Sequence, residues 1–564
     1  MKRRSLLQLP AVAALATAQQ PAPPSVPTSA PPSTPQRISK EQVTAALQLL
    51  GLDFAPEQVE LMLRGVNRGL TGFEDLRKVD VPLDTEPGFS FHPGLASRVA
   101  GTGKPRYRPT VNKSAALGAK SIEDLAFLPV TELAPLLRSK KVTSTELTKT
   151  YLERLKRYSP TLLCVITLTE PLALEQAAEA DQELRRGKYR GPLHGVPWGA
   201  KDLFATKGIP TTWGAEPYQN QVIDRDATVV TRLREAGAVL VAKLSMGALA
   251  QGGLWFGGMT KTPWNIERTS SGSSAGSASA TAAGLVGFAI GTETQGSIIS
   301  PSVACGVMGL RPTYGRVSRA GAMGLSWTMD KIGPICRGVE DLALVLQAIH
   351  GPDGEDRTVT ADPFHWEPRK PLAGLRVGFL PKTFNNFKGE DAKVYAQVLS
   401  DIAKSGVILQ KVDETAYEEL ETLGQKLRPI LIAEASAAFD DITRDGRVGT
   451  LKGQNPNDWP NTFRTSRLIP AVEYIRAQRL RTVLQVKAEK FMTDWDALLI
   501  PPFSLLATTN LTGHPQVVMK CGFVDGAPRG ISFLGKLYDE GTPLRLALAY
   551  EQVTDWHTKH PKLT

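Results

Sequence analysis

Three short segments of the 564-residue chain carry residue types that can do nucleophilic chemistry, and the first contains Lys201. Lys201 closes a short apolar run that begins at Gly195. A lysine in such a place is commonly a surface charge at a strand end, and that interpretation stays open. If the side chain is buried, the loss of hydration lowers its pKa, and the neutral amine can act as a base near neutral pH.

The second segment, residues 270–279, consists only of serine, glycine and alanine. A flexible linker has a similar composition. The apolar run at 280–290 follows at once, however, and favours the start of a buried helix, where free N–H groups and the positive end of the helix dipole are presented. Gly272, Ser274 and Gly276 have the spacing of the nucleophile elbow of α/β-hydrolases, but that motif needs a preceding strand, which residues 262–270 do not indicate.

The third segment runs from Gly291 to Pro301 and places Gly296 directly before Ser297. A glycine before a serine, between two apolar runs, allows a turn in which neighbouring N–H groups converge, as an oxyanion hole requires. A purely structural turn is the alternative. None of the three segments is decisive alone.

These segments lie among predicted helices and short apolar strands. Apolar spacing predicts helices at 131–139, 144–158, 170–186 and 228–236. Short apolar runs predict strands at 238–243, 374–380 and 497–500. This alternation predicts an α/β fold in which helices cover a sheet.

A small helical extension is predicted before the main body. Ser39 and Gln42 form a capping-box pattern, and Pro56 opens a second helix. We therefore expect a helical lead-in and an irregular connection across residues 38–115, followed by the main domain over residues 116–560.

The amino terminus has the features of an export signal. Arg3 and Arg4 precede a short apolar stretch, and a small-x-small cleavage site ends at Ala18, so residues 1–18 are interpreted as a secretory signal peptide. The two arginines resemble the twin-arginine signal, with an ordinary Sec signal as the alternative. Residues 19–37 hold seven prolines and predict an extended linker. The expected location is periplasmic or secreted, and the apolar stretch is too short for a stable membrane anchor.

Composition and charge narrow the classes of function. Hydrophobic residues make up 42% and charged residues 22%, as in ordinary globular proteins. The formal net charge is +10, but no Lys/Arg cluster stands out in the main body, so no nucleic-acid partner is predicted. The four scattered cysteines are interpreted as buried small hydrophobes. His557 and His560 make a poor metal site, and no metal is predicted.

Taken together, the three segments resemble the amidase signature family. The likeness extends over roughly residues 116–560 through five further stretches at 305–313, 330–334, 510–515, 521–523 and 549–552. By this resemblance Lys201 matches the family's basic lysine, Ser273 its bridging serine and Ser297 its nucleophile.

The resemblance implies a fold, an activity and a mechanism. The fold is a large mixed β-sheet covered by helices on both faces, and the activity is that of a serine hydrolase that cleaves amide C–N bonds through an acyl-enzyme. Neutral Lys201 takes the proton of Ser273, which takes that of Ser297. The oxyanion is held by the backbone N–H groups of Thr294, Gln295, Gly296 and Ser297. The bridging serine follows a cis peptide bond, here Gly272–Ser273, and no cofactor is implied.

A substrate site is also expected around the two serine segments. The residues predicted to contact substrate are Trp198, Ser271, Gly272 and Trp255. Tryptophans near the motifs favour an apolar acyl or aryl-amide pocket, and ordinary core packing is the alternative. The expected partner is a small-molecule amide, and the oligomeric state stays open.

The sequence departs from the family pattern at four positions. Ser271, Ala275 and Gln295 replace glycines that are common in the family, although the backbone N–H donors survive these changes. Ile299 stands where many members carry an arginine, so Glu293 is expected to lack that partner.

Other functions remain as alternatives. The central segments also resemble the glutaminase subunit of tRNA-dependent amidotransferases, which works in the cytoplasm with partner subunits, and the signal peptide argues against it. An esterase or carbamate hydrolase on the same fold is a second alternative. An α/β-hydrolase that uses Ser274 with a histidine, and a non-catalytic binding protein, are the others.

Overall fold

The computed structural model describes residues 37–76, 91–94, 101, 103–111 and 121–563. The chain divides into two compact units, residues 1–80 and 81–564. The predicted signal peptide and all but the last residue of the predicted linker lie outside the described residues. Within the described ranges, no helix combines the length and the apolar character needed to cross a membrane.

Two helices form the described part of the N-terminal unit. They are α1 (Lys40–Leu49) and α2 (Pro56–Leu76). Ser39 caps α1 and exchanges hydrogen bonds with Gln42, so the predicted capping box is confirmed. The small core that joins the two helices contains the buried side chains of Val43, Leu47 and Val59.

Residues 103–111 pack within the larger unit. The Arg108 N–H donates to the Trp366 carbonyl at 2.8 Å, and the Glu340 carboxylate accepts from the N–H and hydroxyl of Thr110 at 2.5 and 2.6 Å. The larger unit therefore takes in a segment ahead of the predicted boundary at residue 116. These contacts link an irregular segment to elements that are distant in sequence. Apolar periodicity, which is a local pattern, does not predict them.

An eleven-stranded mixed sheet forms the centre of the larger unit. In spatial order its strands are β1 (Val165–Leu168), β3 (Val239–Leu244), β2 (Pro197–Lys201), β8 (Phe288–Glu293), β10 (Lys331–Cys336), β9 (Met308–Arg311), β14 (Gln516–Val524), β15 (Ala527–Gly535), β13 (Ala497–Ile500), β11 (Val377–Phe379) and β12 (Leu409–Lys411). The neighbours β3, β2 and β8 run parallel, as do β13, β11 and β12. The remaining pairs are antiparallel.

Helices cover both faces of this sheet. On one face α7 (Ala275–Ala282) packs against β8 and contacts α8 (Ile299–Cys305). Ile335 of β10 belongs to the apolar cluster of these two helices. Ile332 lies three residues earlier, so it faces the other side, where α9 (Val339–Ile349) and α18 (Gly541–Gln552) pack. The predicted fold, a mixed sheet with helices on both faces, is confirmed.

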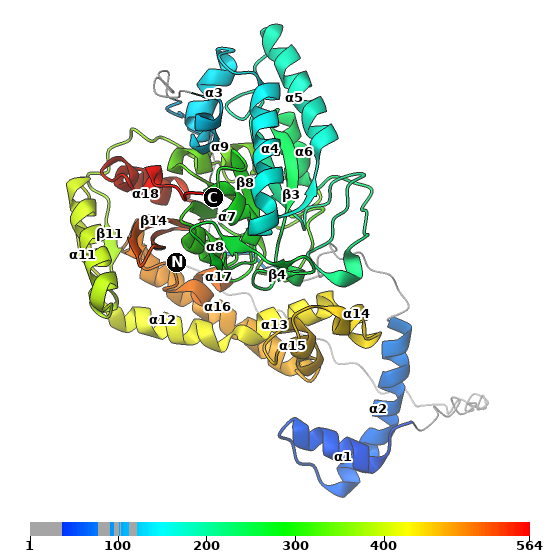
Figure 1. The fold of residues 1–564 in the computed structure, drawn as a ribbon. Helices are drawn as coiled ribbons and strands as arrows, with labels where there is room; N and C mark the ends of the chain where they lie inside the picture. Colours follow the sequence, from blue (N-terminus) through cyan, green and yellow to red (C-terminus); the bar gives the residue numbers. More distant parts are fainter. Residues whose placement is uncertain (1–36, 77–90, 95–100, 102, 112–120, 564) are drawn as a thin grey trace, which may run out of the picture. The chain divides into compact units, whose positions relative to one another are not determined.

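The other helices surround this core. They are α3 (Val130–Arg138), α4 (Ser144–Leu162), α5 (Glu170–Arg185), α6 (Thr228–Glu235), α10 (Pro381–Asn385), α11 (Gly389–Lys404), α12 (Glu414–Lys426), α13 (Arg428–Ala438), α14 (Asp440–Arg444), α15 (Trp459–Ser466), α16 (Ala471–Thr493) and α17 (Leu506–Thr512). Figure 1 shows α12, α13, α15 and α16, in yellow to orange, gathered away from α3, α4 and α5 in cyan.

Most of the predicted elements are confirmed. The four helices expected in the main body correspond to α3 to α6, and the three strands correspond to β3, β11 and β13. Residues 262–270 were not expected to hold a strand, and this was wrong, because β7 (Asn265–Thr269) pairs with β6 (Lys261–Thr262). All five residues of β7 are exposed, so no apolar alternation marks it. Since β7 lies outside the large sheet, it is not the strand of a nucleophile elbow.

The four cysteines are buried free thiols, as predicted: Cys164, Cys305, Cys336 and Cys521. Within the described part of the chain, no group of three or more His, Cys, Asp or Glu side chains is placed to hold a metal ion.

Candidate active site

Lys201 is the last residue of β2, and its side chain is fully buried. Its Nζ lies 2.8 Å from Ser273 Oγ, 2.8 Å from Thr292 Oγ1 and 3.1 Å from Ser274 Oγ. These three partners are hydroxyl groups contributed by the turn before α7 and by the end of β8. The alternative of an exposed charge at a strand end is therefore excluded.

The surroundings of Lys201 change its protonation. Burial lowers the pKa of Lys201 to about 7, although the negative charges of Asp330 and Glu293 oppose this fall. With such a pKa, roughly half of the amine is neutral at pH 7. The side chain can therefore accept a proton under ordinary conditions, and an exposed lysine cannot do so to this extent.

Ser273 lies in a tightly packed turn at the start of α7. The Gly272–Ser273 peptide bond is cis, as the resemblance implies. Only glycine fits at position 272, because a Cβ atom there would lie 1.8 Å from the carbonyl oxygen of Gly252. The Gly276 N–H donates to the Ser245 carbonyl at 2.8 Å and fixes the first turn of α7 against the end of β3. The segment is a helix start and not a flexible linker.

Ser297 lies in the turn between β8 and α8 and is half-buried. Gly296 precedes it with φ of +94°, in a region that favours glycine. The Ser297 carbonyl accepts the Ser274 N–H at 3.2 Å, which joins the two serine-bearing turns. Among the described residues, the N–H groups of Gln295, Gly296 and Ser297 donate to no protein acceptor, so they are available to a ligand.

The hydroxyls of Ser273 and Ser297 are not joined directly. In the described part of the chain, Lys201 reaches Ser273 Oγ, but no hydrogen bond links Ser273 Oγ to Ser297 Oγ. Hydrogen bonds used in catalysis are often long in an enzyme without substrate and tighten when substrate binds. The geometry thus places Lys201 and Ser273 in direct contact and brings Ser297 beside them through its main chain.

Ser274 is held in a structural role by its neighbours. Its fully buried Oγ donates to the Thr292 carbonyl and accepts the Thr292 N–H, each at 3.1 Å, and it also contacts Lys201. These partners include no histidine. The alternative in which Ser274 and a histidine form an α/β-hydrolase site is therefore not supported.

Two of the four residues predicted to contact substrate lie in the serine-bearing turn. Ser271 immediately precedes Gly272 and has φ of +60°, and its Oγ lies 2.6 Å from Ser300 Oγ of α8. Ser271 thus connects the turn before α7 with the helix that follows Ser297.

The two predicted tryptophans have different partners. Trp198 is the second residue of β2 and stacks on Phe288, the first residue of β8, with ring centroids 6.1 Å apart. Since β2 and β8 are parallel, this pair lies at the end of the strands opposite Lys201. Trp255 donates from Nε1 to the Leu163 carbonyl at 3.2 Å. Core packing, the alternative, accounts for Trp198, and a substrate contact by Trp255 stays a prediction.

Comparisons with known proteins identify the family. The Amidase family model matches residues 146–510. The glutamyl-tRNA(Gln) amidotransferase A subunit of Marinomonas sp. (strain MWYL1) is 34% identical over 480 residues, which cover 77% of this chain and 98% of the relative. Its counterpart from Geobacillus kaustophilus (strain HTA426), which has the same name, is 35% identical over 485 residues, with 77% and 99% covered. The chain belongs to the amidase signature family.

A solved structure agrees with this membership. The native peptide amidase from Stenotrophomonas maltophilia superposes with a TM-score of 0.67 at 30% identity, covering 78% of this chain and 99% of the peptide amidase. The chain is therefore an enzyme that hydrolyses amide C–N bonds.

In this amidase Glu293 has a guanidinium partner, although none comes from position 299. Arg311 of β9 donates from Nη1 to Glu293 Oε1 at 2.9 Å, and both side chains are fully buried. Asn510 of α17 donates to the same oxygen at 2.9 Å. Ile299 supplies no guanidinium, as the sequence indicated, but Arg311 of β9 provides one from another position.

Sequence reasoning missed four residues that shape this amidase site. They are Thr292, Arg311, Asp330 and Asn510. All four lie in stretches that resemble the family, so a polar side chain within such a stretch was an available signal. Thr292 was passed over because a threonine in a strand is ordinary.

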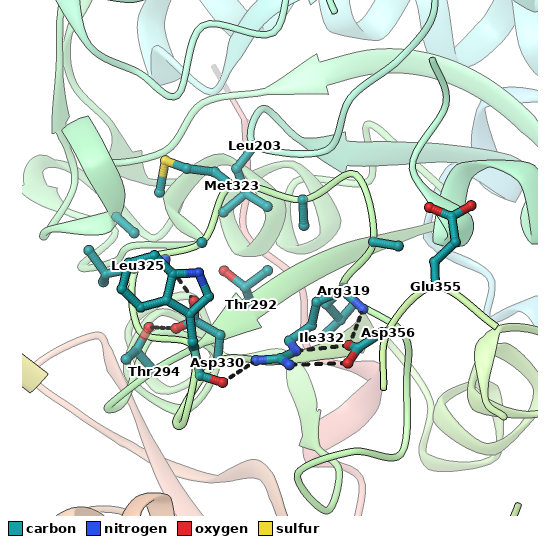
Figure 2. Close-up of a pocket in the computed structure, with 15 residues that line it drawn as sticks. Leu203, Thr292, Thr294, Arg319, Met323, Leu325, Asp330, Ile332, Glu355 and Asp356 are labelled. Atoms are coloured by element: carbon teal, nitrogen blue, oxygen red, sulfur yellow. Dashed lines mark hydrogen bonds and ion pairs between the residues drawn. The ribbon is translucent and has the colours of Figure 1, made fainter. Parts of the chain in front are cut away.

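A cavity of about 150 Å³ lies beside Thr292 and Thr294. Much of its lining is apolar, with Leu203, Met323, Leu325, Trp327 and Ile332. Figure 2 shows Arg319 directed at Asp356, and Thr294 beside Asp330. Arg319 donates from Nε and Nη2 to the Asp356 carboxylate at 3.0 and 3.2 Å. The guanidinium in this cavity is thus paired with a carboxylate of the protein.

Proposed function

We propose that this amidase cleaves its substrate through an acyl-enzyme, with Ser297 as nucleophile, Ser273 as bridge and Lys201 as base. The observation that carries the proposal is the environment of Lys201. This buried amine has a pKa near 7, and its direct partners are hydroxyls, one of them that of Ser273. A base poised near the working pH is what general-base catalysis requires.

The steps follow from these positions. Neutral Lys201 accepts the proton of Ser273 as Ser273 takes the proton of Ser297, and Ser297 Oγ bonds to the carbonyl carbon. The carbonyl π electrons move to oxygen, and the N–H groups of residues 294–297 stabilise the resulting oxyanion. When the oxyanion collapses, the C–N bond breaks and the proton returns through Ser273 to the leaving amine. Water then attacks the acyl-enzyme by the same relay and releases the acid.

The substrate we propose is a small amide without a negative charge near the scissile bond. The cavity beside Thr292 and Thr294 is mostly apolar, and its guanidinium, that of Arg319, is already paired with Asp356. Asp330 and Glu355 add further carboxylates to the lining. A substrate carboxylate placed there would meet negative charge without an available counter-ion, which is costly.

Glutaminase activity is the second candidate, and the named relatives favour it. The A subunit of the Marinomonas glutamyl-tRNA(Gln) amidotransferase is 34% identical over 77% of this chain. Glutamine carries an α-carboxylate, however, and the charge of the cavity argues against that substrate. Carbamate and ester hydrolysis use the same relay and stay within the proposal as further reactions.

We propose export to the periplasm or the medium from the amino-terminal sequence alone. Its basic start, short apolar stretch and Ala18 cleavage site support this location. Fractionation of cells that express the full chain, with Arg3 and Arg4 either native or both replaced by lysine, tests the route. Retention of the lysine variant in the cytoplasm indicates twin-arginine export, and unimpeded export indicates the Sec route. A native chain that stays uncleaved in the cytoplasm overturns export.

One experiment tests the activity itself. The purified enzyme and Ser297→Ala are assayed against primary, aryl and peptide C-terminal amides, glutamine, carbamates and esters, and both proteins are treated with a serine-directed fluorophosphonate. We expect labelling and amide turnover in the native protein only, with glutamine among the poorest substrates. Equal activity of the two proteins, or no labelling of the native one, contradicts the proposed mechanism.

A further inference from the structure

Two buried carboxylates lie at the two ends of the turn that carries Ser297. Glu293 is the last residue of β8 and directly precedes the turn. Asp330 directly precedes β10, whose first residue pairs with Glu293 across the sheet. Glu293 is 0% exposed and Asp330 is 9% exposed. Neither residue has a place in the proton relay.

Glu293 holds the far end of the turn, and each of its two carboxylate oxygens accepts two hydrogen bonds. Its Oε2 accepts the N–H groups of Ile298 and Ile299 at 2.8 and 2.9 Å. Its Oε1 accepts from Arg311 and Asn510, each at 2.9 Å. One carboxylate thus ties the residues after Ser297 to β9 and to α17, so the start of α8 cannot shift alone.

Asp330 holds the near end of the same turn. Its Oδ1 accepts the Thr294 hydroxyl at 2.5 Å. Its Oδ2 accepts the N–H groups of Leu325 and Ser326 at 2.8 and 2.9 Å, which anchor the carboxylate to a separate loop. Thr294 is therefore held in place through its side-chain hydroxyl. Its main-chain N–H is not used by Asp330 and stays with the other N–H groups of the turn.

The N–H groups of Gln295, Gly296 and Ser297 lie between these two anchored points. An oxyanion hole works only when its donors stand about 2.7–3.1 Å from the position of the oxyanion. Gly296, with φ of +94°, makes this turn intrinsically pliable, because glycine restricts its backbone least. A pliable turn with fixed ends keeps the donors in place without bonding them to the protein.

The same carboxylates are the charged groups that act on Lys201. Their negative charges favour its ammonium form and oppose the effect of burial. The neighbouring strand contributes Lys243, but that cation is paired with Asp202 at 2.9 Å. Burial raises the pKa of Asp330, and the hydrogen bonds from Thr294, Ser326 and Leu325 oppose that rise. For Glu293 the Arg311 guanidinium and the N–H donors outweigh burial, and its pKa is lowered.

We propose that Glu293 and Asp330 are positioning residues that clamp the oxyanion turn from both ends. This inference rests on the proposed function, because it assigns the turn to an oxyanion and Lys201 to a base. Glu293 acts through the Ile298 and Ile299 N–H groups, and Asp330 acts through the Thr294 hydroxyl.

The test compares Glu293→Gln and Asp330→Asn with the native enzyme on the best amide substrate. Removal of one oxyanion-hole donor costs about 10²–10³-fold in kcat, and a displaced turn should cost on the order of 10-fold to that limit, with little change in KM. Each variant also loses a negative charge near Lys201. The pKa of Lys201 should then fall, and the acid limb of kcat/KM should move to lower pH.

Glu540→Gln is the matched control. Glu540 is fully buried and pairs with Arg316 at 2.7 Å, so it resembles Glu293 in burial and partner but holds no part of the turn. We expect this control to lower the melting temperature and to leave kcat and the pH profile of the folded enzyme unchanged. If Glu293→Gln does not yield folded protein, Asp330→Asn and Thr294→Val, which removes only the hydroxyl, carry the test.

The outcomes separate this inference from the proposed function. If Ser297→Ala is inactive while the folded clamp variants keep native kcat and an unmoved acid limb, the clamp is wrong and the relay stands. If Ser297→Ala keeps activity, the relay itself fails. A loss of kcat in the Glu540 control equal to that in the clamp variants would also overturn the inference, because it would reduce the effect to general stability.

Discussion

Lys201 and Lys243 stand on adjacent parallel strands, and both side chains are fully buried, yet their partners differ. Lys243 pairs across the strands with Ala200, the residue next to Lys201. Its Nζ lies 2.9 Å from Asp202 Oδ1 and donates to Thr211 Oγ1 at 2.9 Å. Among the residues that the structure describes, Lys201 has hydroxyl oxygens alone as direct partners, and the carboxylates that influence it act from beyond that first contact.

The difference shows that burial alone does not make a lysine a base. Burial lowers the pKa of both side chains, but for Lys243 the charge of Asp202 and its hydrogen bond oppose the fall directly. A carboxylate at 4 Å is worth about 4 kcal/mol at an effective dielectric constant near 20, which corresponds to roughly three pKa units. Lys243 is therefore equipped as a structural cation and Lys201 as a proton acceptor.

The largest expected effect is the loss of the base. Lys201→Met should lower kcat/KM by about 10²–10⁴-fold, the contribution of a positioned general base, while the protein remains folded. Met fits because it is unbranched and replaces a buried amine by apolar atoms. Steady-state kinetics with circular dichroism and thermal melting check this. Activity within tenfold of the native enzyme would remove Lys201 from the mechanism.

The matched change at Lys243 should act on stability instead. Lys243→Met leaves Asp202 buried without its counter-ion, which should cost about 3–5 kcal/mol in the free energy of unfolding. Adding Asp202→Asn removes the orphaned charge and should recover most of that loss. Urea denaturation of the two variants measures both numbers. If the double variant is no more stable than the single one, the unpaired charge of Asp202 is not the cause of the lost stability.

The pH dependence of kcat/KM offers a further test of the difference between Lys201 and Lys243. Because the base must be neutral and burial lowers the pKa of Lys201 to about 7, kcat/KM should fall as the pH drops through about 7 and level off above it. The Lys243→Met variant leaves an unpaired carboxylate near Lys201, which favours the ammonium form. Its acid limb should therefore move to higher pH. A limb that stays in place in this variant would show that Asp202 does not act on Lys201.

The contrast between the two lysines also shows which features of the site could be predicted from the sequence. Lys201, Ser273 and Ser297 could be chosen because small residues and glycines surround them in motifs that act locally, and the cis bond at Gly272–Ser273 came with that resemblance. Within the fold, the helices and strands followed from local apolar spacing. Exposed β7 was missed because its five residues carry no buried pattern.

Ion pairs between residues distant in sequence could not be predicted, because the fold and not the local sequence brings the partners together. Arg311 reaches Glu293 from β9, although β10 lies between their two strands, and Asp202 directly follows the strand next to that of Lys243. The separation of these residues along the sequence therefore does not predict either contact. Trp198 was chosen because aromatic residues often line pockets, but strand direction places it at the other end of β2. The catalytic residues could be predicted because their motifs are local in sequence. The charged residues around them could not be predicted, because the fold brings them from distant segments.

The smallest effect on activity is expected from a substitution at Thr292. It tests how a hydroxyl partner of Lys201, as opposed to a carboxylate partner, influences the pKa of the amine. Thr292→Val keeps the shape and removes the Oγ1 that lies 2.8 Å from Lys201 Nζ. A hydrogen bond of this kind contributes about 1 kcal/mol, which is less than one pKa unit. The ammonium form loses an acceptor, so the acid limb should move to lower pH by a fraction of a unit, with only a few-fold change in kcat. A shift to higher pH would mean that Thr292 stabilises the neutral amine, and the hydroxyl shell of Lys201 would then favour the base and not its conjugate acid.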